Sequence, residues 1–271
     1  MKPTMLALVL AVSVLGLAAS SFADGTPPAP PSAPAAPVAP IHDPDAVKFM
    51  HNLQDTIEKQ TDADALAAVK QLVAYWKDPA VKDSTKQPMP GLVAWYARRK
   101  VVPVAMAGIS GLADIGKGEG SKHLLVVLGD LLDRDPPTPQ MTAAVFSALK
   151  RVADPDSAAI KPLLKLFNYK DDTIVAKAID TLGGYKDAPV DLRKDLFQEL
   201  LKTFEPLASE AHSSTAPGKA ATANKSALNK WGVVGGPVLS SMGALAHTSF
   251  ADMPAARKWI NDHHRDPDAW K

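Results

Sequence analysis

Residues 103–132 read PVAMAGISGLADIGKGEGSKHLLVVLGDLL, residues 143–167 read AAVFSALKRVADPDSAAIKPLLKLF, and residues 173–201 read TIVAKAIDTLGGYKDAPVDLRKDLFQELL. Apolar residues recur in these stretches every three or four positions, as at Val145, Leu149 and Val152 in the second. That spacing places them on one face of an α-helix and does not fit the alternation of a half-buried strand. The three stretches therefore predict amphipathic helices, and helical spacing runs through the chain from residue 43 onward.

The predicted helices come in pairs that resemble one another. An apolar couple spaced three residues apart marks the first helix of each pair, and the couples are Met50/Leu53, Ile109/Leu112, Phe146/Leu149, Ile179/Leu182 and Met242/Leu245. A further apolar residue follows thirteen or fourteen positions after each leucine, at Leu66, Leu125, Leu163, Leu196 and Trp259. The central leucines Leu112, Leu149 and Leu182 are 37 and 33 residues apart. A helix–turn–helix unit that recurs at such a period predicts stacked units that bury one another's apolar faces.

The three quoted stretches resemble consecutive repeats of the HEAT and armadillo type, most closely over residues 103–204. The resemblance implies an all-α solenoid of about five stacked antiparallel helix pairs, with a groove that binds a protein or another ligand. The period in this chain is shorter than the roughly 40–47 residues usual for that type. HEAT repeats are defined by their packing, so the resemblance implies no catalytic residue.

The first 23 residues have the layout of a secretory signal. Lys2 precedes an apolar run over residues 5–19, and Ala23 ends a short segment of the kind that a signal peptidase reads. The run is shorter than the ~20 residues that a membrane-spanning helix needs. We therefore expect a cleaved signal over residues 1–23, no stable membrane span, and a periplasmic or extracellular protein; an uncleaved N-terminal anchor is the alternative.

The remainder divides into a linker and a helical domain. Residues 24–42 are dominated by Pro and Ala, a composition that favours an extended or disordered segment over a packed core. Residues 43–271 are expected to form the helical domain. Residues 82–91 read as a turn-rich connection, and the small residues of 208–223 predict a flexible loop before the last unit.

Composition excludes several kinds of chemistry. The chain has no Cys, which rules out disulfides, Cys-ligated zinc, c-type haem attachment and a Cys nucleophile. With 30 Lys and Arg against 29 Asp and Glu, it lacks the basic excess that nucleic-acid binders use to neutralise phosphates. We expect no nucleic-acid partner and no cofactor.

Four short motifs suggest chemistry, but each is better explained by helix geometry. Residues 111–118 approach the phosphate-loop pattern, yet Gly118 stands where Ser or Thr is needed, so Gly116 and Gly118 are interpreted as helix-ending glycines. Ser147 and Lys150 match S-x-x-K without the other elements that such enzymes need. His263 and His264 are adjacent and would point about 100° apart on a helix, so we expect no metal site there.

The D-P-D triplets at residues 43–45, 154–156 and 266–268 lack the Gly and the terminal Glu of a calcium loop. Asp followed by Pro is typical of a helix start, so Asp43 and Asp154 are expected to cap helices. Trp231, Trp259 and Trp270 are expected to seal the C-terminal end of the stack.

One surface candidate stands out. The densest aromatic and basic cluster of the chain consists of Trp95, Tyr96, Arg98, Arg99 and Lys100. Aromatic residues and Arg anchor many protein interfaces, whereas aromatics packed between repeats beside a solvated basic turn are the structural alternative.

These observations favour a non-enzymatic binding or scaffold protein that handles a protein or an envelope component. Two alternatives stay open. One is an enzyme on an α-helical superhelix, for example a carbohydrate-active one, which would need two carboxylates facing one cleft. The other is an envelope spacer in which residues 24–40 matter more than the helical surface.

Overall fold

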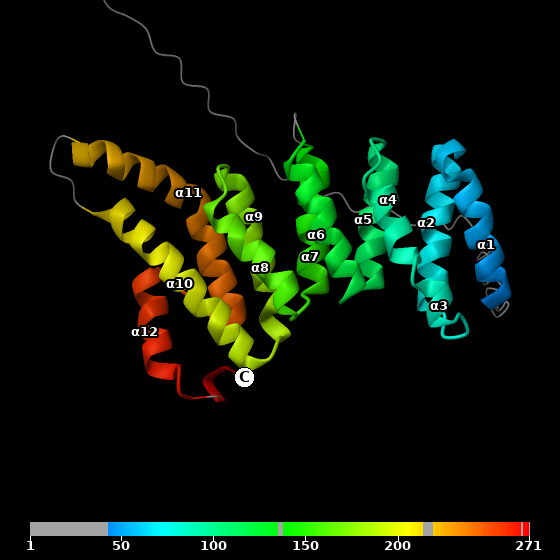
Figure 1. Ribbon diagram of the computed structural model, residues 1–271. Coiled ribbons are helices and arrows are strands. Elements are labelled where there is room, and N and C mark those ends of the chain that lie inside the picture. The colour runs from blue at the N-terminus through cyan, green and yellow to red at the C-terminus, as the bar shows by residue number, and fades with distance from the viewer. Residues whose placement is uncertain (1–42, 135–137, 214–218, 267, 271) are drawn as a thin grey trace, which may run out of the picture. The chain divides into compact units, whose positions relative to one another are not determined.

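All regular structure in the described part of the chain is helical. The computed structural model describes residues 43–134, 138–213, 219–266 and 268–270, with the backbone alone for residues 219–224. No strand occurs in these ranges, which confirms the prediction of an all-α protein (Figure 1). None of the helices in them combines the length and the apolar character needed to cross a bilayer. The predicted signal at 1–23 and the predicted linker at 24–42 both lie outside the described residues.

The N-terminal third contains a helix that the sequence pattern missed. Its elements are α1 (Asp43–Thr56), η1 (Ile57–Lys59), α2 (Asp62–Lys77), α3 (Asp83–Lys86) and α4 (Met89–Ala97). The expected connection over residues 82–91 therefore contains α3 and the start of α4. Pro90 lies in the first turn of α4, where a residue without an N–H breaks no helical hydrogen bond. α4 is apolar on almost every side, so no periodic apolar face marks it in the sequence. Pro88 and Pro90 in addition suggest a turn at its start.

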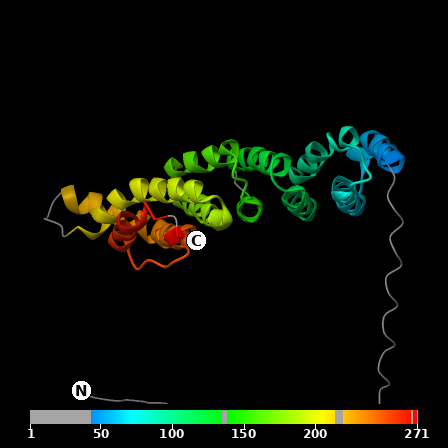
Figure 2. The same ribbon diagram turned by 90° about the horizontal axis from the view of Figure 1, so that it is seen from below.

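The middle of the chain forms two adjoining rows of helices. Its elements are α5 (Val102–Ile115), α6 (Glu119–Leu132), α7 (Pro139–Val152), α8 (Ser157–Lys165), η2 (Leu166–Asn168), α9 (Asp172–Leu182) and η3 (Gly183–Asp187). In one row α5 packs on α7, α7 on α9 and α9 on α11 (Lys219–Ala246), and in the other α4 packs on α6 and α6 on α8. Figure 2 shows these helices following one another side by side in chain order.

The pairing within these rows starts one helix earlier than the sequence spacing suggested. The closest partner of α5 is α4, which precedes it, and the closest partner of α7 is α6. The apolar couples are buried as expected, with Ile109 and Leu112 at most 2% exposed. The pattern thus identified the buried faces correctly. The segment 82–91, read as a connection, includes the first three residues of α4, so the pattern did not mark where α4 begins.

The last third is built on one long helical hairpin. It contains α10 (Val190–His212), α11 (Lys219–Ala246), α12 (Met253–His263) and η4 (Asp268–Trp270). α10 packs along α11, and α11 packs on α9. The loop predicted over residues 208–223 is too long: residues 208–212 continue α10 and residues 219–223 begin α11, while residues 214–218 lie outside the description. The small residues there, largely Ala, are compatible with helix, and reading them as loop was wrong at both ends.

Two of the three tryptophans expected to close the C-terminal end do meet there. Trp270 is fully buried, with its ring 4.8 Å from that of Trp259 and 5.7 Å from that of Phe197. Arg193 of α10 is also buried, and its guanidinium donates to the backbone carbonyls of Leu245 and Trp270. Trp231 lies elsewhere, against His212 and Gly235. The cluster therefore ties η4 to α10, α11 and α12.

Gly108 fixes how closely α4 and α5 approach each other. A Cβ at this position would lie 2.4 Å from the backbone nitrogen of Ala97, which cannot move without shifting α4. We expect Gly108→Ala to destabilise the protein by about 2 kcal/mol, the range of overpacked cores. Gly91→Ala is the matched control, because a Cβ there meets nothing within 4 Å and alanine favours the helix. Urea unfolding of both variants measures the difference, and equal stabilities would contradict the close packing of α4 on α5.

Candidate functional site

The aromatic and basic cluster predicted from the sequence lies at the end of α4 and in the turn that follows it. Tyr96 is not part of the surface: its side chain is fully buried, and its hydroxyl donates to Oε1 of Gln60 over 2.6 Å. Burial raises the pKa of Tyr96 to about 12, against a smaller opposing effect of the bond to Gln60. Tyr96 therefore supports the surface from beneath and stays protonated at neutral pH.

Trp95 and Arg99 form the exposed part of the cluster. Both are partly exposed, and Cζ of Arg99 lies 4.7 Å from the centroid of the Trp95 ring. The Trp95 ring meets the buried Tyr96 ring edge-on, 5.1 Å between centroids. Stacking on a ring restricts a long flexible cation, so less conformational entropy is lost when that cation binds a partner.

Arg98 connects this cluster to the next helix of its row. Its Nε lies 2.8 Å from Oδ2 of Asp130 on α6, and its backbone carbonyl accepts a 3.0 Å hydrogen bond from Nη2 of Arg134. Arg134 was missed by sequence reasoning, although a signal existed. Arg98, Arg134 and Lys170 are spaced 36 residues apart, so each turn after a helix of this row carries a cation at the same register.

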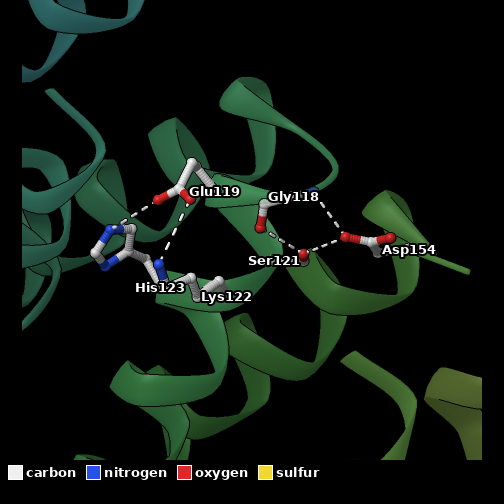
Figure 3. Close-up of polar contacts among 6 residues, drawn as sticks. All are labelled: Gly118, Glu119, Ser121, Lys122, His123 and Asp154. Carbon is white, nitrogen blue, oxygen red and sulfur yellow. Dashed lines mark hydrogen bonds and ion pairs between the residues drawn. The ribbon is translucent and has the colours of Figure 1, made fainter. Parts of the chain in front are cut away.

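A second polar centre lies where α6 begins, beside the turn from α7 to α8 (Figure 3). Asp154 is 6% exposed, and its Oδ2 accepts from the backbone N–H of Gly118 at 2.7 Å and from the hydroxyl of Ser121. Its Oδ1 accepts from the N–H of Asp156. Burial alone would raise the pKa of Asp154, but the hydrogen bonds from Ser121, Gly118 and Asp156 outweigh it and hold the pKa below its ordinary value.

The helix cap predicted at Asp154 is therefore wrong in its position. The cap of α8 is Asp156, whose side chain accepts from the N–H of Ala158. Asp154 instead caps the neighbouring helix α6 across the turn. Asp43 does stand at the start of α1, but its carboxylate accepts from the N–H of Lys82 and the hydroxyl of Thr85. In two of the three D-P-D triplets, the first Asp thus accepts hydrogen bonds from residues that are distant in sequence.

The glycine-rich segment of residues 111–118 lacks the strand–loop–helix context of a phosphate-binding loop. A helix, α5, precedes it instead of a strand, and Gly116 ends that helix with a φ of 92°. The expectation that Gly118 ends a helix is wrong. With a φ of 76°, Gly118 leads into α6. The Asp154 carboxylate already occupies the anion position at this helix N-terminus.

Ser121 and His123 lie in the first turns of α6 and Asp154 lies beside them after α7, but the three do not form a catalytic triad. As Figure 3 shows, His123 turns toward Glu119, with Nε2 and Oε2 3.6 Å apart, while Ser121 bonds to Asp154 and Gly118. Burial lowers the pKa of His123, and the Glu119 carboxylate partly offsets this. Ser121 is 2% exposed and has no base beside it, so the geometry is that of a structural cap.

The other sequence motifs do not assemble into sites. Lys150 pairs with Asp180 on α9 at 2.8 Å, while Ser147 faces solvent. The His263 ring packs near Trp259, whereas Nδ1 of His264 lies 3.1 Å from a backbone carbonyl. Within the described ranges, no group of three or more His, Asp or Glu is arranged to hold a metal ion.

A groove between α10 and α12 contains several carboxylates, which is the feature that an enzyme on a helical superhelix would require. Its volume is about 850 Å³, and Asp195, Glu199 and Glu205 line it. Hydrogen bonding to Arg257 lowers the pKa of Glu205, whereas a general acid needs a raised one. Asp195 is exposed. Glu205 is therefore engaged in an ion pair with Arg257 and is not placed as a general acid.

No protein-family model matches the sequence, and no curated protein resembles it at a significant level.

Proposed function

We propose that this chain is an exported, non-enzymatic protein that binds a protein partner in the cell envelope through a stack of HEAT-like helix units. The observation that carries the proposal is the Trp95–Arg99 pair, a partly exposed aromatic with a cation held over its face at the end of α4. Such pairs suit the central anchors of protein interfaces, which are enriched in Trp and Arg. The neighbouring ion pair of Arg98 with Asp130 fixes the backbone beneath it.

The repeat part of the proposal is supported by polar contacts that span one repeat period. Tyr96 bonds to Gln60 across 36 residues, Arg134 bonds to Arg98 across 36, and Tyr169 lies 3.4 Å from the carbonyl of Leu132 across 37. These separations match the 37 and 33 residues between the central leucines. Equivalent contacts at equivalent positions are expected of stacked units that share a common plan.

The proposal is tested by comparing what the full chain and a double variant capture from envelope fractions of the native cells. Trp95→Ala combined with Arg99→Glu removes the ring and reverses the charge, and we expect the amount of the principal captured protein to fall about thirtyfold or more. Lys70→Glu is the control, since Lys70 is exposed on α2 and lies outside the cluster. Equal capture by the double variant, or the absence of any reproducible partner, would contradict the proposal.

A further inference from the structure

A groove separates the turn after α6 from the turn before α9, about one repeat period along the chain from the Trp95 cluster. It encloses about 760 Å³, and Leu132, Arg134, Tyr169, Lys170, Ile174 and Lys177 are among its lining residues. Arg134 connects it to the cluster, because its guanidinium bonds to the carbonyl of Arg98. The groove and the Trp95–Arg99 pair therefore belong to successive turns of the same row.

The three cations of the groove form no ion pair within the described residues. Among the described residues, Arg134, Lys170 and Lys177 have no carboxylate within ion-pair distance, whereas Arg98, Lys150 and Arg151 each have one. Asp171, one of the two acidic residues in the lining, already caps α9 by accepting from the N–H of Thr173. Asp133, the other, is exposed at the end of α6. Both carboxylates keep their charge, so the lining holds three cations against two anions, and its small positive excess is complementary to an anionic ligand.

The floor of the groove is apolar. Tyr169, Ile174 and Leu132 are partly buried and pack against the core, and the Tyr169 hydroxyl is directed to the backbone of Leu132. A ligand that fills the groove must therefore combine negative charge with an apolar side chain. An acidic peptide segment has both, whereas a sulfated or phosphorylated polymer offers charge without the apolar group.

We propose that this groove binds an acidic peptide segment of a protein partner, with Arg134, Lys170 and Lys177 receiving carboxylates and the Tyr169–Ile174 floor receiving an apolar side chain. The inference rests on the proposed function. It specifies the chemistry of the partner segment that binds about one repeat period along the chain from Trp95. Guanidinium and ammonium groups placed on several sides of one groove recognise spaced carboxylates.

A displayed library of random peptides of about twelve residues, selected on the full chain, provides the probe. We expect the selected peptides to be enriched in Asp and Glu beside an apolar residue. They should bind Lys170→Glu/Lys177→Glu at least about thirtyfold more weakly than the unmodified chain. Lys70→Glu/Lys258→Glu is the matched control, because it changes the charge equally at two exposed lysines outside the groove. Circular dichroism of both double variants establishes that they are folded.

Several outcomes would overturn the inference. They are selection of no peptide, selection of peptides without acidic enrichment, equal binding by the groove variant, and stronger competition by heparin than by a free acidic peptide. Failure of the broader proposal is distinguished by envelope capture. If the groove variant captures the same partner as the unmodified chain while Trp95→Ala/Arg99→Glu does not, the binding function stands and the groove assignment falls.

Discussion

Replacing Trp270 with alanine is expected to lower the free energy of unfolding by about 4 kcal/mol, the cost of removing a large aromatic side chain from a packed core. Trp270 is fully buried, and its ring packs against Trp259 and Phe197. Its indole N–H also lies 3.2 Å from the carbonyl of His263. The loss would loosen η4, whose carbonyl at Trp270 accepts from Arg193, and so would leave part of a buried guanidinium without a partner.

Urea unfolding followed by far-ultraviolet circular dichroism measures this effect. Trp270→Phe is the control: it keeps an aromatic ring in the cluster and loses the indole N–H, so about 1 kcal/mol is expected. A loss below about 1 kcal/mol for Trp270→Ala would show that the C-terminal residues are not part of the packed core.

Asp154→Ala is expected to destabilise the protein by about 3 kcal/mol. The substitution removes the common acceptor of the Gly118 and Asp156 backbone N–H groups and of the buried Ser121 hydroxyl. Ser121→Ala removes only one of these donors and should cost about 1 kcal/mol. Asp262→Asn, at an exposed position of α12, is the control and should be neutral.

The stabilisation from Asp154 also has a definite pH dependence. Because the folded-state pKa of Asp154 is lowered below its usual 3.8, the carboxylate contributes fully above that value and its contribution is lost as the pH falls through the folded pKa. Asp154→Asn should therefore be less stable than the unmodified chain at neutral pH, with the difference shrinking in acid. Thermal unfolding between neutral and acidic pH measures this, and a difference that persists unchanged in acid would contradict the role of the charge.

Helical spacing predicted the buried faces because burial of one apolar face is a local property of the sequence. Val145, Leu149 and Val152 are buried as their spacing indicated. The same reasoning failed at the start of α4, where Pro88 and Pro90 suggested a turn over the first three residues of the helix. The register of the helix pairs consequently had to come from the contacts between helices.

The polar centres could not be predicted in the same way, because they join residues that are distant in sequence. Nothing within D-P-D distinguishes a cap of the following helix from a cap of a helix 36 residues earlier, as Asp154 is for Gly118. The surface cluster at Trp95 was visible as composition, but only the structure separates buried Tyr96 from exposed Trp95 and Arg99. Arg134 and Lys170 are 36 residues apart, and the structure shows that this spacing brings both of them to one groove.

The proposed binding surface is tested most directly by site-specific photo-crosslinking in the native cells. A photoreactive phenylalanine analogue placed at Lys100, the exposed residue next to Arg99, should give one discrete crosslinked product with a protein of the cell envelope. The same analogue at Lys70, exposed on α2, should not give this product. No product from position 100, or the same product from both positions, would contradict binding through the Trp95–Arg99 surface.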